Sequence, residues 1–129
     1  MPVHLDHTIV PAHDKEASAA FLAQILGLPD PVPMGPFSAV ALDGGLTLDF
    51  ADADGPVRPI HYAFAVSAAE FDTIFDRVQA RGLPYWADPQ RRRPGEVAQR
   101  GRGRGFYFPD PSGHFLEVLT RGEVEQRAA

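Results

Sequence analysis

The spacing of apolar residues along the chain predicts two amphipathic helices. From Asp14 to Leu26, and again from Ser67 to Arg81, apolar residues recur at intervals of three and four, the spacing of one buried helix face. Asp14 is a good N-cap for the first helix, and Ser67 forms a capping box with Glu70 in the second. The tripeptide Gly-Leu-Pro follows each run and is typical of a helix end. Both helices are therefore expected to have well-defined ends.

These helices belong to an internal repeat. A strand-like segment with a histidine precedes each helix, and the two histidines, His7 and His61, are 54 residues apart. Further strands are expected after each helix, at 38–42, 46–50, 105–108 and 115–119. The turns between them are Asp-Gly-Gly in the first half and Asp-Pro-Ser-Gly in the second. Two units of the same order predict an α+β fold in which each sheet has a helix on one face only.

Polar residues recur at corresponding strand positions in the two halves. His7 and His61 begin the first strand of each half, whereas Asp49 and Glu117 lie in the middle of the last strand. A carboxylate between apolar neighbours costs several kcal/mol to bury unless it is paired or binds a metal. The four residues are therefore candidate metal ligands. The alternative is that the carboxylates are solvated or pair with arginines.

Composition narrows the possible chemistry. The chain of 129 residues is 44% apolar and 22% charged, which fits one globular domain. It contains no cysteine, so disulfides, thiolate metal sites and cysteine nucleophiles are excluded, and any metal must bind histidine, aspartate or glutamate. Neither a signal peptide nor a membrane span is evident, so we expect a cytoplasmic protein without a membrane partner. The formal net charge of −5 argues against nucleic acid as a partner.

An arginine-rich segment accounts for the extra length of the second half. Residues 89–104 carry six of the 12 cationic side chains. A solvated loop, a nucleic-acid contact and a lid over an anionic substrate are the three interpretations. In the third, Arg102 and Arg104 bind the substrate, Tyr107 donates a hydrogen bond and Trp86 forms a wall of the pocket. The other three histidines, His4, His13 and His114, are expected to be structural or solvated.

Four short motifs give the chain a family resemblance. They lie at 5–9 (LDHTI), 25–28 (ILGL), 60–64 (IHYAF) and 108–118 (FPDPSGHFLEV), and the last is the most specific. With them, residues 5–121 resemble the vicinal oxygen chelate (VOC) superfamily, which contains glyoxalase I, fosfomycin and bleomycin resistance proteins and extradiol dioxygenases.

The resemblance implies a fold and an assembly. It implies two tandem βαβββ modules that form a curved mixed sheet around a metal or ligand cleft, within a single domain over 1–129. Module 1 would span about 3–55 and module 2 about 58–121, with a C-terminal tail at 122–129. A homodimer is expected, and in some relatives one metal ligand crosses between chains, so that His7 would come from the partner chain.

The resemblance also implies a ligand set. A three-ligand site uses His7, His61 and Glu117 and suits Fe(II) or Mn(II). A fourth ligand at Asp49 would suit Zn(II) or Ni(II), but relatives usually carry glutamate there, and the aspartate side chain is one methylene shorter.

The expected function follows from that site. It is a divalent-metal enzyme whose metal is chelated by two oxygens of a small substrate, and an anion is one candidate for that substrate. Oxygenation is preferred to isomerase or lyase chemistry. No residue identifies the general base. The alternative is a metal-free protein that sequesters a drug or metabolite, as bleomycin-resistance relatives do.

Overall fold

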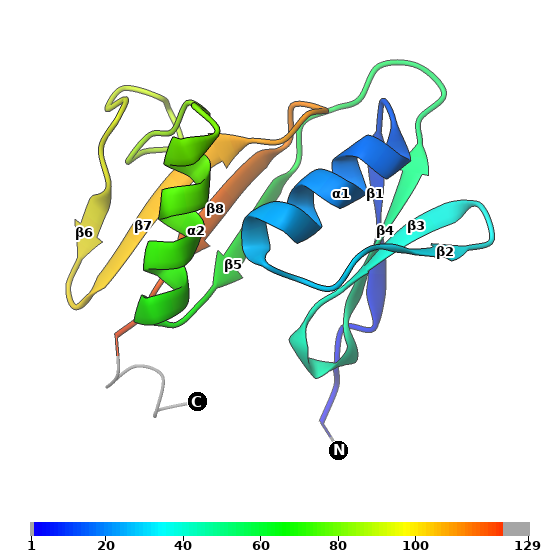
Figure 1. Ribbon diagram of the computed structural model, residues 1–129, viewed down its shortest axis with the longest axis horizontal. Helices are drawn as coiled ribbons and strands as arrows, with labels where there is room; N and C mark the ends of the chain where they lie inside the picture. Colours follow the sequence, from blue (N-terminus) through cyan, green and yellow to red (C-terminus); the bar gives the residue numbers. More distant parts are fainter. Residues whose placement is uncertain (1, 123–129) are drawn as a thin grey trace. The chain divides into compact units, whose positions relative to one another are not determined.

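The first module has one helix and four strands. The computed structural model describes residues 2–122 and is shown in Figure 1. The elements of this module are β1 (His7–Ala12), α1 (Lys15–Leu26), β2 (Val32–Met34), β3 (Phe37–Ala41) and β4 (Thr47–Asp52), with a short 3₁₀ turn, η1 (Asp43–Gly45), between β3 and β4. The sheet order is β1-β4-β3-β2, and only the β1–β4 pair is parallel.

The second module repeats this arrangement. Its elements are β5 (His61–Ala65), α2 (Ala68–Ala80), β6 (Ala98–Arg100), β7 (Gly103–Pro109) and β8 (Phe115–Leu119). The sheet order is β5-β8-β7-β6, and again the first strand pairs in parallel with the last. The predicted α+β class and βαβββ order are confirmed. Strand β6 lies within the arginine-rich segment 89–104, so this segment is partly a hairpin arm.

The helix ends have the residues that the capping rules require. The Asp14 carboxylate accepts hydrogen bonds from the backbone N–H groups of Glu16 and Ala17, and the Ser67 hydroxyl accepts one from the N–H of Glu70. Gly27 and Gly82 follow α1 and α2 with positive φ values of 71° and 65°, which glycine adopts without steric cost. Local sequence therefore sets where each helix begins and ends.

Each helix covers one face of its own sheet, and the core of each module lies between them (Figure 1). In the first module the buried side chains include Val10, Leu22, Ile25, Val40 and Phe50. In the second they include Phe71, Ile74, Val78, Phe106 and Phe108, and the Phe106 ring meets Phe71 and Phe75 edge-on. Because strand side chains alternate, the residues between these core positions face away from the helix.

The chain divides into two compact units at Arg58–Pro59. The turn Asp110–Gly113, between β7 and β8, belongs to the first unit, where the Ser112 hydroxyl accepts a hydrogen bond from the backbone N–H of His13. The second unit contains Pro59–Pro109 and the chain from His114 onward. The module ranges 3–55 and 58–121 remain predictions. Most of the predicted tail, 123–129, lies outside the described residues.

No helix within residues 2–122 combines the length and apolar character needed to cross a membrane.

Gly103 is expected to be indispensable for packing at the start of β7. A Cβ atom at this position would overlap the backbone carbonyl oxygen of Thr120, which has little room to move. Gly103→Ala should therefore lower the free energy of unfolding by about 2 kcal/mol or more, as measured by urea denaturation. Gly105→Ala is the matched control, since its nearest neighbour would be Val118 O at 3.5 Å, an ordinary contact. Equal unfolding midpoints for the two variants would contradict this account.

Candidate functional site

The face of the second sheet opposite α2 brings polar side chains together. In the register of β5, β8 and β7, Glu117 lies between Ala63 on one side and Tyr107 on the other. His61 begins β5 and points to the same face as Ala63 because strand side chains alternate. Ala63 is small, so it leaves space above the strand for the neighbouring imidazole.

Glu117 is the centre of this group. Its side chain is 6% exposed, and the two carboxylate oxygens have different partners. Oε1 lies 2.9 Å from Nε2 of His61, and Oε2 accepts a hydrogen bond from Nη1 of Arg100 at 2.9 Å. The side chains of His61 and Arg100 are about half exposed. The buried carboxylate is thus satisfied by two groups that reach solvent, which removes most of the cost of burying its charge.

Arg100 links Glu117 to Tyr107. Its Nη2 donates a hydrogen bond to the Tyr107 hydroxyl at 3.1 Å. The hydrogen bond to Glu117 raises the pKa of Arg100 above its ordinary value, and the weaker effect of the hydrogen bond to Tyr107 acts in the same direction. Partial burial lowers the pKa but does not outweigh these two bonds. Arg100 is not among the site residues predicted from sequence. The signal that could have found it is the β6–β7 hairpin, in which Arg100 shares a face with Gly105 and Tyr107.

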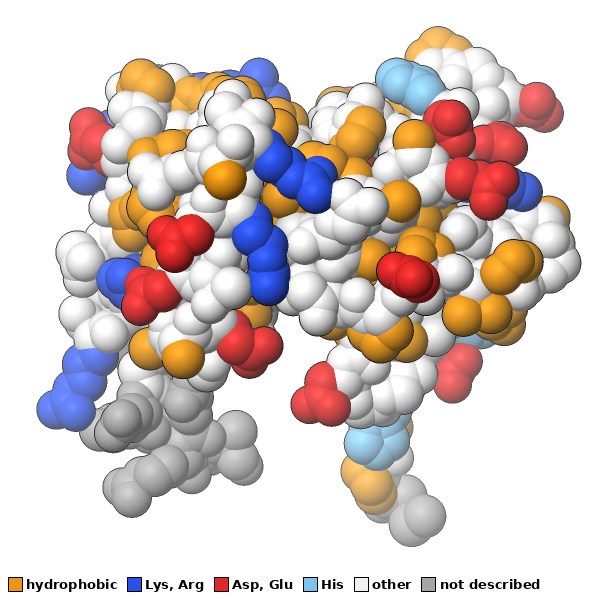
Figure 2. All heavy atoms as spheres, in the orientation of Figure 1, with side chains coloured by type: hydrophobic (Ala, Val, Ile, Leu, Met, Phe, Trp, Pro, Cys, Tyr) orange, Lys and Arg blue, Asp and Glu red, His pale blue; other side chains and the backbone are white. Residues whose placement is uncertain are grey.

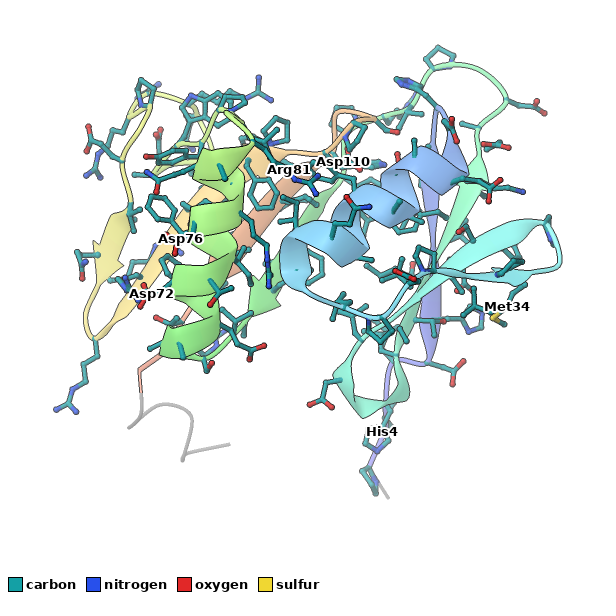
Figure 3. The ribbon with its side chains drawn as sticks, viewed as in Figure 1. His4, Met34, Asp72, Asp76, Arg81 and Asp110 are labelled. Atoms are coloured by element: carbon teal, nitrogen blue, oxygen red, sulfur yellow. The ribbon has the colours of Figure 1, made fainter. Side chains whose placement is uncertain are left out.

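The two arginines named from sequence lie elsewhere. Arg104 points to the α2 side of β7, where it pairs with Asp72 at 3.0 Å and lies over the Phe71 ring. Figure 3 shows Asp72 and Asp76 on α2, and Figure 2 shows acidic side chains gathered over this helix. Arg102 is exposed in the turn between β6 and β7. Their substrate-binding roles stay predictions, but Arg100 is the arginine that the sheet brings to Glu117.

Aromatic rings extend the site along the same face. Trp86 pairs through its backbone with Tyr107, and its ring lies 6.2 Å from Phe115 between centroids. Phe115 stacks on Tyr107 at 5.6 Å, and Tyr107 lies 5.7 Å from His61. We call Trp86, Phe115 and Tyr107 the aromatic row. It leads from the arginine-rich segment to the His61–Glu117 pair.

The first module carries the other two candidate ligands. His7 is exposed at the start of β1, with Nδ1 2.7 Å from Oδ2 of Asp6. This hydrogen bond, with smaller contributions from the charges of Asp6 and Asp49, raises the pKa of His7 above its ordinary value although desolvation opposes the shift. Asp49 lies opposite Ile9 and is 5% exposed. Its Oδ1 atom is buried and has no hydrogen-bond partner among the described residues.

The structure therefore brings the candidates together in pairs. His61 and Glu117 are in contact within the second module, and the charge of Asp49 acts on His7 within the first. Between residues 2 and 122, no group of three or more histidine, aspartate or glutamate side chains is placed to hold a metal ion. The complete ligand set stays a prediction.

The remaining histidines have other surroundings. His114 is fully buried, and its Nδ1 accepts a hydrogen bond from the backbone N–H of Ile60 at 3.0 Å. This contact holds the residue just before His61, so His114 positions the start of β5. His4 is exposed on the N-terminal segment before β1 (Figure 3).

Comparison with known proteins decides the family. The model of the Glyoxalase/Bleomycin resistance protein/Dioxygenase superfamily matches residues 4–118. The chain belongs to this superfamily. The solved structure of oxidase ChaP-H1 is 57% identical, with a TM-score of 0.91 and coverage of 93% of this chain and 97% of that one.

The chain is also similar, at lower identity, to a glutathione transferase and to a fosfomycin resistance protein. Glutathione transferase FosA of Serratia marcescens is 27% identical over 131 residues, covering 97% of this chain and 85% of that protein. The structure of the fosfomycin resistance protein FosX from Mesorhizobium loti, 24% identical with a TM-score of 0.70 over the full length of both chains, shares the fold.

The raised pKa of His7 is open to direct measurement. Asp6→Ala removes both the hydrogen bond and the charge, so the pKa of His7 should fall toward its ordinary value in an NMR titration. Asp54→Ala, an exposed aspartate outside these contacts, is the control. An unchanged pKa in Asp6→Ala would show that the pair does not form in solution.

Proposed function

We propose that this protein is a divalent-metal enzyme that oxidises a small organic substrate with molecular oxygen. The contact between His61 and Glu117 is the observation that carries the proposal. Two ligands at right angles, each about 2.1 Å from one ion, lie roughly 3 Å apart. Nε2 of His61 and Oε1 of Glu117 are 2.9 Å apart, so the spacing and the chemistry of these donors fit a metal.

We propose His7 as the third ligand. Two imidazoles and one carboxylate form the set that suits Fe(II), or Mn(II), with positions left for substrate and oxygen. Asp49 is left out of the set, because its side chain is one methylene shorter than the glutamate usual in four-ligand relatives. When bound, the metal supplies Lewis acidity toward two chelating oxygens of the substrate.

The other residues of the site hold the ligands and the substrate. Arg100 occupies Oε2 of Glu117 and so turns Oε1 toward His61. The same guanidinium fixes the Tyr107 hydroxyl, which is thereby available to accept or donate a second hydrogen bond to a substrate oxygen. The aromatic row provides an apolar surface next to the proposed metal, where a substrate would exclude water.

The similarity to an oxidase supports oxidation over group transfer. Oxidase ChaP-H1 shares 57% of its aligned residues with this chain, whereas the transferase FosA shares 27%. A second candidate function is metal-free binding of a small molecule. The Arg100–Glu117 ion pair favours that candidate, since it satisfies the buried carboxylate without a metal ion.

Metal content separates these two functions. Protein reconstituted anaerobically with Fe(II) should retain about one iron per chain by elemental analysis, and His61→Ala or Glu117→Ala should lose it. His4→Ala, an exposed histidine outside the site, should retain the metal. Nitric oxide binds iron that has an open coordination position, so it should give an EPR signal in the wild type. A chain that takes up no metal under any reconstitution would support the binding protein instead.

A mixing experiment shows which chain supplies His7. We expect a homodimer by light scattering, in which His7 of one chain completes the site of the other. Co-expressed His7→Ala and Glu117→Ala chains should then form heterodimers that hold one iron, because one of the two sites keeps all three ligands. Each homodimer alone should hold none. If a site drew all its ligands from one chain, the heterodimers would bind no iron either.

A further inference from the structure

Arg91 has an unusual backbone conformation. Its φ is 62°, and no other non-glycine residue within 2–122 has a positive φ. A long side chain is strained there, and such strain persists only where neighbouring groups impose it. The position therefore calls for an explanation of what holds Arg91 in place and what its side chain does.

A network of hydrogen bonds from Asp88 holds the backbone. The Asp88 carboxylate accepts hydrogen bonds from the N–H groups of Arg92, at 3.0 Å, and Arg93, at 2.8 Å. Although burial opposes the shift, these bonds keep the pKa of Asp88 below its ordinary value. The N–H of Ala87 also bonds to the carbonyl of Arg93 at 3.1 Å. These hydrogen bonds fix the conformation of the turn around Arg91.

This turn places the Arg91 guanidinium on the aromatic row. Its Cζ lies 5.1 Å from the centroid of the Trp86 ring and 4.8 Å from that of Phe115. Phe115 stacks on Tyr107, which in turn contacts His61. Arg91 is therefore on the same face of the sheet as the His61–Glu117 pair, at the other end of the row.

Three arginines of the arginine-rich segment are neutralised by acidic side chains, and Arg91 is not among them. Arg100 pairs with Glu117, Arg93 with Glu96 and Arg104 with Asp72. The Arg91 guanidinium has neither an acidic partner nor a hydrogen-bond partner among the residues that the structure describes. Ring faces hold the cation but leave the N–H groups at its edge free to donate.

We propose that Arg91 binds the anionic group of an aromatic carboxylate substrate. A guanidinium edge matches a carboxylate through two parallel hydrogen bonds, and the aromatic row offers ring contacts beside it. This inference deepens the proposed function, because it names the substrate class of the same site. Anion binding itself needs no metal, so it can be tested on the metal-free chain.

Trp86 is the only tryptophan in the sequence, so its indole N–H gives a single NMR reporter within the row. The probes are 2-naphthoate and its uncharged counterpart 2-naphthamide, titrated into metal-free ¹⁵N-labelled protein. The variants are Arg91→Asn and, as the matched control, Arg92→Asn. Asparagine tolerates positive φ, so the first variant removes the guanidinium while keeping the turn.

Naphthoate should shift the Trp86 indole signal in the wild type. Arg91→Asn should weaken naphthoate binding by about tenfold and change the naphthamide affinity by no more than about twofold. Arg92→Asn should bind both probes like the wild type. Equal weakening of both probes, equal effects of both variants, or no naphthoate binding at millimolar concentration would each overturn the proposal. Iron uptake by Arg91→Asn separates the two hypotheses. If iron uptake is normal but the naphthoate test fails, the proposed enzyme function is retained and the Arg91 proposal is rejected. If naphthoate binds selectively but no iron is taken up, the anion site is retained and the proposed metal enzyme is rejected.

Discussion

The structure of the candidate site depends on the burial of one carboxylate. Glu117 lies in the middle of a strand with 6% of its side chain exposed, and an unpartnered charge there would oppose folding by several kcal/mol. His61 and Arg100 prevent this cost by occupying one oxygen each. Any function of this face must therefore keep both oxygens partnered, by these side chains, by a metal ion or by a ligand.

The corresponding carboxylate of the first module shows what happens without such partners. Asp49 is also in the middle of the last strand of its sheet, paired with the first strand in the same parallel register. On the adjacent strand, the residue opposite Asp49 is Ile9, whereas the residue opposite Glu117 is the smaller Ala63. No arginine reaches it, and its Oδ1 has no hydrogen-bond partner in the described chain. The two modules thus share topology but have diverged in side-chain chemistry.

Local signals explain why most of the fold could be predicted from sequence. Caps and glycines mark both helices. The matching strand positions of the two halves drew attention to His61 and Glu117, which the structure places in contact. The prediction was less complete in the arginine-rich segment, because β6 has only three residues, two of them polar, and gives no alternation to read. Because this strand was not predicted, Arg100 was not recognised as a residue of the site. Arg104, which the sequence predicts as a substrate ligand, lies on the α2 side of its strand and pairs with Asp72.

The ion pair between Arg100 and Glu117 is compatible with a metal as well as with its absence. A carboxylate has two oxygens, and the guanidinium occupies only Oε2, so a cation can bind Oε1 while the pair persists. Two positive groups on one carboxylate repel each other, which weakens metal binding, yet the same arginine fixes the direction of Oε1. Without this arginine, the carboxylate would rotate more freely. In the proposed metal site, Arg100 would therefore lower the metal affinity while fixing a single, oriented donor atom next to His61.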